Sequence, residues 1–286
     1  MRVSGIHIIV PVLLLLFVAP CIGGQWNSWS ACTGRLFRGG DPGDKALLPL
    51  LFEETMENGR PFARASSLET GDWNYALQFV AQPVFQGKWA ARFEIRDDQP
   101  LVKHGKRSEV VVVKGRDGQL GRNVWYSFAA YFPSEGYEYD TTREVINQWY
   151  QDGSPATSLR TQGDSFLLET GPTPESRRRF GLGTIEKDRW HEFVFHFVHA
   201  HGDEGLIEVW HDGAKVLTHR GGNMYDDVLP KWKIGLYKAA FKRGTSLVHR
   251  RVVYFDNIKV GSERAVFRDM IPSLDVARER QDRNDQ

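Results

Sequence analysis

The chain is a succession of short segments rich in β-branched and aromatic residues, and this pattern constrains its fold more than any other feature. Most segments end at Gly, Pro, Asn or Asp, and none of the stretches between them has a long 3.6-residue periodicity. We therefore predict an all-β protein, a jelly-roll β-sandwich of two antiparallel sheets. The predicted strands are Ala76–Val80, Ala90–Ile95, Arg107–Val113, Val124–Phe132, Val145–Tyr150, Ser165–Glu169, Trp190–Val198, Leu206–His211, Trp232–Tyr237 and Val252–Val260.

The sequence predicts four segments, of which the first is a signal peptide at residues 1–24. Arg2 is its only charge, Ile8–Ala19 is almost wholly apolar, and small residues precede a cut before Gln25. The apolar run is short for a membrane span, so we expect a secreted or periplasmic protein without stable membrane insertion; an uncleaved anchor and lipidation at Cys21 stay open. An N-terminal extension (25–49), the jelly-roll domain (50–262) and a charged C-terminal tail (263–286) follow.

Charge and cysteine content bound the partners. Cleavage after residue 24 removes Arg2 and leaves 36 basic and 36 acidic residues, so bulk charge says nothing about partners, and we expect no nucleic-acid partner. Cys32 is then the only cysteine, so no intramolecular disulfide can form and the core alone must hold a domain that we expect to be monomeric. Basic clusters around Lys103 and Lys231 favour an anionic ligand, whereas we interpret Arg177–Arg179 as a solvated loop.

Polar and apolar residues alternate along Lys231–Lys238 with the period of a half-buried strand. The pattern places Lys233, Gly235 and Tyr237 on one face, an ammonium and a phenol separated by a residue without a side chain. We interpret this face as a substrate floor, where a ligand lies against the backbone at Gly235.

Two other predicted strands each present a polar pair at positions i and i+2. These are Arg107 with Glu109, and Gln148 with Tyr150. Any antiparallel sheet with one solvated face shows such alternation, so each pair alone is weak evidence. The guanidinium, amide, ammonium and phenols together favour a functional site.

These segments carry a resemblance to a known family. Arg107-Ser108-Glu109, Gln148-Trp149-Tyr150 and Lys233-Ile234-Gly235-Leu236-Tyr237, in this order, resemble the jelly-roll (concanavalin A-like) polysaccharide lyases. The heparin lyase I and glucuronan lyase group is most similar, and family-seven alginate lyases are similar more distantly. The resemblance covers about residues 50–261.

The resemblance implies β-elimination on an anionic, uronate-containing polysaccharide, without a cofactor for catalysis. A base removes the C5 proton, an acid donates to the departing O4, and donors hold the C6 carboxylate. By this resemblance Tyr237 is the base and acid, Lys233 its neighbouring lysine, and Gln148 and Arg107 bind the carboxylate. The polymer itself, and endo or exo action, do not follow from the sequence.

The chain departs from the family at Tyr150, where relatives often carry histidine. We interpret Tyr150 as a helper that orients the substrate. A tyrosine base needs a nearby cation to stabilise its phenolate, and either Lys233 or Arg107 could serve. The residues expected to bind substrate around this centre are Glu109, which would also orient Arg107, with Asn147, Trp149 and Lys238.

The sequence contains candidate ligands for two kinds of metal site, a calcium site and a zinc site. The resemblance implies a structural calcium ion held by Asp256, with Glu53 facing it from the first strand, since hard oxygen ligands suit calcium. His196, His199 and His201 match no strong zinc signature, and His191 is interpreted as structural.

Two other functions compete with the lyase. A lectin-like carbohydrate-binding module would use Trp149 and Trp232 as stacking platforms and needs no base. A jelly-roll glycoside hydrolase needs two carboxylates that flank the bond, and the Glu-x-Asp-x-x-Glu strand of the laminarinase-like group is absent. Specificity is expected in two loops, Gln151–Thr161 and Gly171–Arg179.

Overall fold

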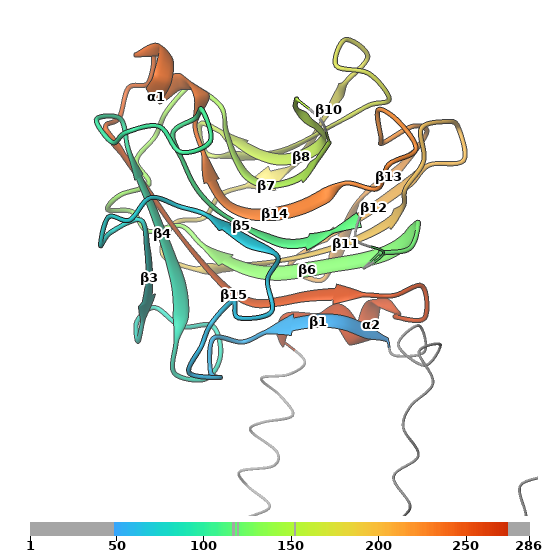
Figure 1. Cartoon of the computed structure of the whole chain (residues 1–286), viewed down its shortest axis with the longest axis horizontal. Coiled ribbons are helices and arrows are strands. Elements are labelled where there is room, and N and C mark those ends of the chain that lie inside the picture. Colours follow the sequence, from blue (N-terminus) through green and yellow to red (C-terminus); the bar gives the residue numbers. More distant parts are fainter. Residues whose placement is uncertain (1–48, 116–117, 119, 152, 274–286) are drawn as a thin grey trace, which may run out of the picture. The chain divides into compact units, whose positions relative to one another are not determined.

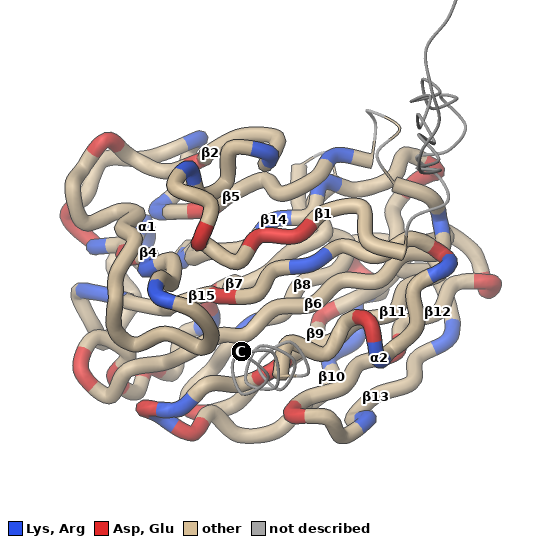
Figure 2. The backbone as a smooth tube through the Cα atoms, turned by 90° about the horizontal axis from the view of Figure 1, so that it is seen from below, with Lys and Arg blue, Asp and Glu red and all other residues tan. Residues whose placement is uncertain are grey.

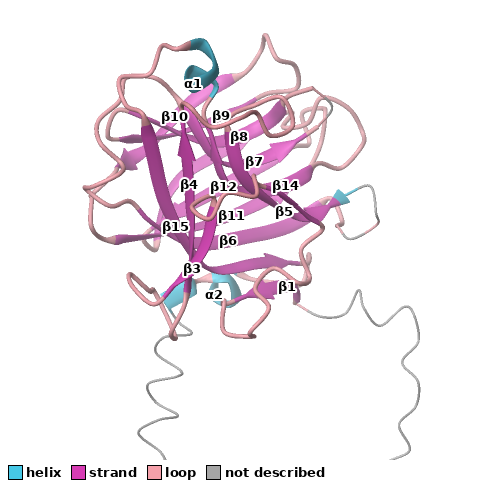
Figure 3. Cartoon of the chain, turned by 60° about the vertical axis from the view of Figure 1, so that its left-hand side comes forward, coloured by secondary structure: helices cyan, strands magenta, loops and turns pink. Residues whose placement is uncertain are grey.

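A computed structural model describes residues 49–115, 118, 120–151 and 153–273. The predicted signal peptide, all but the last residue of the extension, and the end of the tail lie outside these residues. Almost all regular structure is strand, with only short helical pieces (Figure 3). The elements are β1 (Leu50–Glu54), β2 (Ser67–Glu69), β3 (Leu77–Val80), β4 (Ala90–Arg96), β5 (Arg107–Lys114), β6 (Asn123–Tyr131), β7 (Glu144–Tyr150), β8 (Pro155–Gln162), β9 (Ser165–Thr170), β10 (Arg178–Thr184), β11 (Trp190–Val198), β12 (Leu206–His211), β13 (Ala214–Arg220), β14 (Lys231–Tyr237), α1 (Ala239–Arg243), β15 (Arg250–Gly261) and α2 (Phe267–Met270).

The strands form two antiparallel sheets, which confirms the predicted sandwich. One sheet has the order β13-β12-β11-β6-β15-β4-β3, with β1 paired to β15. The other has the order β10-β9-β8-β7-β14-β5-β2 and curves so that α1 and β10 stand above its outer face (Figure 1). We call this outer face the concave face. No helix among the described residues is long and apolar enough to cross a membrane.

The core lies between the sheets and follows the alternation of the sequence. On β14, Trp232, Ile234 and Leu236 are all fully buried in the core. Trp232 packs on Tyr126 of the opposite sheet, with ring centroids 4.9 Å apart. Burial of such large side chains on one face of the strand leaves the residues between them for the concave face.

Gly235 is required by the sheet itself rather than by a ligand. Its φ is +122°, and a Cβ added there would lie 2.3 Å from the carbonyl oxygen of Ser108 on β5. Irregular pairing on both sides of β14 accompanies this approach. The expectation of room for a ligand at Gly235 is therefore wrong, because the neighbouring strand occupies that space.

Two segments expected to be loops are partly strands. Residues 155–162 form β8 and residues 178–184 form β10, although Pro, Arg and Gly in them give no alternating apolar pattern. The first part of the expected charged tail also packs on the domain, since Met270 of α2 is fully buried. Its sulfur lies beside Gly261, where a Cβ would meet it at 2.8 Å.

Candidate active site

The predicted polar pairs meet on adjacent strands of the concave face. Glu109 and Arg107 of β5 lie opposite Gly235 and Tyr237 of β14, and Lys233 lies opposite Gln148 of β7. The neighbouring strands β7, β14 and β5 thus bring together the side chains of three segments that are distant in the sequence, and β2 adds Glu69 beside them. We call Glu69, Arg107, Glu109, Gln148 and Lys233 the central cluster.

Ion pairs tie the central cluster together. Nη1 of Arg107 lies 3.0 Å from Oε2 of Glu109 and 3.3 Å from Oε2 of Glu69. Nζ of Lys233 lies 2.8 Å from the same Glu69 oxygen, and the Gln148 amide donates to Glu109. Glu109 therefore orients Arg107, as expected, and it also orients Gln148.

The two carboxyls of the cluster differ in their electrostatics. Burial opposes ionisation of Glu69, but the hydrogen bond and charge of Lys233 outweigh it and lower its pKa. Complete burial raises the pKa of Glu109, against the opposing charges of Lys233 and Arg107. Glu69 and Glu109 both accept from neighbouring cations or amide donors. Neither is therefore available as the catalytic acid or base that a glycoside hydrolase needs.

The two phenols have different cations as neighbours. The guanidinium carbon of Arg107 lies 4.7 Å from the ring centre of Tyr237. Nζ of Lys233 lies 4.4 Å from the ring centre of Tyr150 and is hydrogen-bonded to Glu69. Of the two cations that the sequence offered for Tyr237, Arg107 is thus the one beside it.

Exposure separates accessible from supporting side chains. Arg107, Tyr150 and Tyr237 are partly exposed, whereas Gln148 and Lys233 are each only 2% exposed. In this conformation Gln148 and Lys233 support the site from beneath, and the expected direct contact of Gln148 with a substrate carboxylate is not available. Arg107 and the two phenols, Tyr150 and Tyr237, are thus the predicted catalytic groups that are open to solvent on this face.

A cationic cavity of about 540 Å³ adjoins Tyr237. Five arginines and two glutamates line it, giving a formal charge of +3. Glu169 accepts from Arg160 at 2.8 Å, from Arg179 at 2.7 Å and from Arg143. Burial opposes ionisation of Glu169, but the charge of Arg160 and the hydrogen bond of Arg179 lower its pKa. The arginines are Arg143, Arg160, Arg177, Arg179 and Arg243, and the second glutamate is Glu175.

Glu109 is only 1% exposed and cannot contact a substrate directly, and the structure corrects three further expected substrate-binding residues. Trp149 is fully buried and packs on Phe197 across the core, with ring centroids 4.4 Å apart. Lys238 is fully buried beside Asp140 and Glu144, at 3.1 and 2.9 Å. These side chains stabilise the domain and cannot touch a polymer.

Asn147 is the third. It is 1% exposed, and its amide nitrogen donates to the backbone carbonyl of Lys233 at 2.8 Å. The donor is used to join β7 to β14, so the expected contact with substrate is wrong. Because Trp149 and Trp232 both lie in the core, the stacking platforms proposed for a lectin-like module are not on the surface either.

Asp256 and Glu53 do not fit a shared calcium site. The two Asp256 oxygens accept backbone N–H groups of Phe85, Gln86 and Asn257 at 2.8–3.2 Å. Glu53 is exposed and lies 3.9 Å from Nζ of Lys259. The two Asp256 oxygens thus already accept three backbone hydrogen bonds. Glu53 faces the ammonium of Lys259 and not Asp256, so the two carboxylates do not form a calcium site together.

The three histidines at the end of β11 have separate partners. His196 contacts Glu208 and Asn123, and His201 contacts the carbonyl of Met224. His199 contacts the Tyr126 hydroxyl at 2.9 Å, and burial lowers its pKa to about 3. They form no common metal site.

Sequence reasoning missed Glu69 and the arginine-lined cavity. Glu69 lies on a three-residue strand, too short for a pattern. The solvated loop expected at Arg177–Arg179 is correct in exposure, since Arg179 is exposed, but Arg179 lies on β10 and lines the cavity together with Arg177. The only signal is the arginine triplet itself, which lies between the predicted strands Ser165–Glu169 and Trp190–Val198.

Comparison with known proteins identifies a family. A sequence model of the family described as polysaccharide lyase matches residues 60–259, which confirms the resemblance. A search of curated proteins found no match.

Solved structures with the same fold include enzymes of more than one class. An endo-β-1,4-glucuronan lyase from the fungus Trichoderma reesei has a TM-score of 0.62 and 21% identity, covering 78% of this chain and 98% of that chain. The catalytic domain of a glycoside hydrolase family 131 protein from Coprinopsis cinerea has a TM-score of 0.51 and 11% identity, covering 74% and 93%. An alginate lyase from Pseudomonas aeruginosa has a TM-score of 0.44 and 17% identity, covering 60% and 82%. At 21% and 11% identity, the first two matches show a likeness of fold alone.

Proposed function

The chain belongs to the polysaccharide lyase family, and from this premise we propose that it cleaves a uronate-containing polysaccharide by β-elimination. The observation that carries the proposal is the placement of Tyr237 between the Arg107 guanidinium and a cavity of formal charge +3. An anionic sugar matches that charge, and a phenol beside a cation matches the base that the reaction needs.

In the proposed reaction the Tyr237 phenolate removes the C5 proton of the uronate. The electron pair of the C5–H bond forms the C4–C5 double bond while the C4–O4 bond breaks. The phenol that results donates its proton to the departing O4, so the residue returns to its starting state. Arg107 stabilises the phenolate and binds the C6 carboxylate as negative charge develops on it.

The remaining residues position these two groups. Glu109 and Glu69 hold the Arg107 guanidinium through its Nη1 atom, and Lys233 holds Glu69. Tyr150 presents a partly exposed phenol on β7, the strand next to β14, and would orient the sugar by a hydrogen bond. The cavity arginines would hold the carboxylate of a neighbouring sugar unit.

The test is a panel of purified polyuronates that includes glucuronan, alginate and heparin. Each is incubated with the protein and scored by the ultraviolet absorbance of the unsaturated product. We expect absorbance to rise with at least one polymer. New reducing ends without that absorbance would instead mean hydrolysis, and binding without any cleavage would mean a carbohydrate-binding module.

We include export in the proposal, because the apolar segment at residues 8–19 is followed by small residues. N-terminal sequencing of the mature protein should begin near Gln25. A mature protein that begins with a lipidated Cys21 would contradict the freely secreted form.

A further inference from the structure

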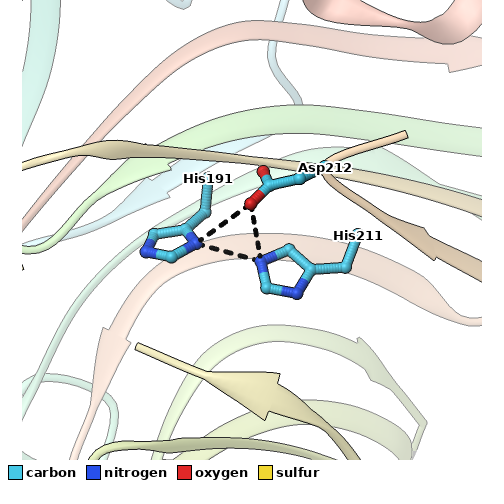
Figure 4. A group of neighbouring side chains, drawn as sticks. All are labelled: His191, His211 and Asp212. Atoms are coloured by element: carbon cyan, nitrogen blue, oxygen red, sulfur yellow. Dashed lines mark hydrogen bonds and ion pairs between the residues drawn. The ribbon is translucent and has the colours of Figure 1, made fainter. Parts of the chain in front are cut away.

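A second polar cluster lies outside the site described above, where β11 and β12 meet. His191 is the second residue of β11, His211 is the last residue of β12, and Asp212 follows in the turn to β13. Their side chains point toward one another (Figure 4). Among the described residues, they are the one group of three or more metal-ligating side chains with ligand atoms within 4.8 Å of one another. None of the three lines the cavity beside Tyr237.

Backbone carbonyls fix the hydrogens of both imidazoles. Nε2 of His191 lies 2.9 Å from the carbonyl oxygen of Glu186, and Nδ1 of His211 lies 3.0 Å from that of Leu182. A carbonyl oxygen only accepts, so each of these outward nitrogens carries a hydrogen. In a neutral imidazole the other nitrogen is then a bare acceptor.

The two inward nitrogens face each other without a hydrogen of their own. Nδ1 of His191 lies 2.9 Å from Nε2 of His211, and Oδ2 of Asp212 lies 3.6 and 3.4 Å from these atoms. Three electron-rich atoms at these distances repel one another unless a positive charge lies among them. The Arg189 guanidinium pairs with the Asp212 oxygen, and between the two nitrogens the charge is either an additional proton or a metal cation.

The geometry favours a metal cation. The three distances of 2.9, 3.6 and 3.4 Å form a triangle whose corners lie about 1.9 Å from one common point, close to zinc–nitrogen and zinc–oxygen bond lengths of about 2.0–2.2 Å. Histidines whose second nitrogen donates to a backbone carbonyl are also the usual ligands of protein zinc, because that hydrogen bond fixes the ring.

We propose that His191, His211 and Asp212 bind a zinc ion. Two imidazole nitrogens and one carboxylate oxygen are a donor set that zinc accepts, with solvent as the fourth ligand at the exposed Asp212 side. The ion joins the ends of β11 and β12. Through His211 it also fixes Leu182 of β10, and through His191 it fixes Glu186 in the connection between β10 and β11. Its role is to stabilise this end of the sandwich.

Arg189 is the group that opposes the ion. Its guanidinium pairs with the same Asp212 oxygen and, at 2.9 Å, with Glu186. A cation there repels a metal and competes for the carboxylate. Removing its charge should therefore strengthen zinc binding, whereas binding at any distant site would not change.

The experiment measures zinc binding to the full chain after treatment with a chelator. Equilibrium dialysis against Zn²⁺ with elemental analysis gives stoichiometry and Kd, and the visible spectrum of the Co²⁺ form reports the ligand geometry. The variants are His211→Ala, Asp212→Asn and Arg189→Gln. The matched control is His196→Ala, which removes a histidine that also lies 2.9 Å from a carboxylate but has no second histidine beside it.

We expect one zinc ion per chain in the wild type and in His196→Ala. Kd should rise at least about 100-fold in His211→Ala, rise about 10-fold in Asp212→Asn and fall severalfold in Arg189→Gln. Asp212→Asn keeps the acceptor for the Glu192 N–H and tolerates the left-handed φ of 49°, so it tests the proposal even where His211→Ala does not fold. A wild type that binds no zinc, or variants that bind it as the wild type does, would overturn the proposal.

Discussion

Replacing Arg107 by glutamine tests whether its charge makes Tyr237 a base. If the 4.7 Å between the guanidinium carbon and the ring centre is taken as the separation of the two charges, a unit charge stabilises a phenolate by about 3.5 kcal/mol at an effective dielectric of ~20. Glu69 and Glu109 share that guanidinium, and we take about half of the attraction to remain, or about 2 kcal/mol. The variant should therefore lose about 30-fold in kcat at pH 7.

The assay is kcat and KM at pH 7, followed by product absorbance. Glutamine keeps amide donors at this position but carries no charge, so the loss should appear in kcat, with KM for the polymer changed much less. The control is Arg96→Gln, whose guanidinium lies 3.9 Å from the ring centre of Tyr75, away from the cavity. A rise in KM with kcat retained would refute the electrostatic reasoning and leave Arg107 only a binding role.

Three other changes have defined outcomes. Tyr237→Phe should lower kcat by about 100-fold or more with binding retained and Tyr150→Phe should cost less, so steady-state kinetics in the opposite order would move the base to Tyr150. Lys238→Ala leaves two buried carboxylates without their ammonium and should lower the free energy of unfolding in urea by about 3–5 kcal/mol, whereas Lys242→Ala on the exposed side of α1 should change it little. Burial lowers the pKa of His199 to about 3, so between this value and its ordinary pKa of about 6.5 the unfolded chain binds a proton that the folded chain does not. Stability is therefore present above pH 6.5 and falls as the pH falls, by about 2 kcal/mol at pH 5, and a His199→Gln variant with the same pH dependence in urea would contradict this.

The sequence predicted the sandwich because burial on one face leaves a period-2 pattern along each strand. The same pattern predicts that Trp149 points into the core from β7, on the other face from Gln148. The expectation that Trp149 binds substrate contradicts this alternation. Strands without the pattern were missed, as in β8 and in the exposed edge strand β13.

The candidate site was predictable only in part. The period-2 pattern predicts which face of the sheet a side chain lies on, but not which strands pair with one another. Arg107 and Tyr237 meet because β5 pairs with β14, a pairing between segments far apart in the chain. The burial of Lys238 beside Asp140 and Glu144 depends on packing beyond the end of β14, where alternation gives no information.

Because the cavity is positively charged, we expect the affinity of the enzyme for its polymer to depend on the salt concentration. Basic and acidic residues are interspersed along the backbone (Figure 2), so the surplus of positive charge is local to the cavity. Glu169 neutralises one of the three arginines that it holds, and the proposed uronate polymer would supply negative charge to the others. Salt screens such attraction beyond about 10 Å at 0.1 M and beyond about 3 Å at 1 M. Capture of the polymer from solution should therefore be fast in fresh water and slow in brine, with turnover of bound chains much the same in both.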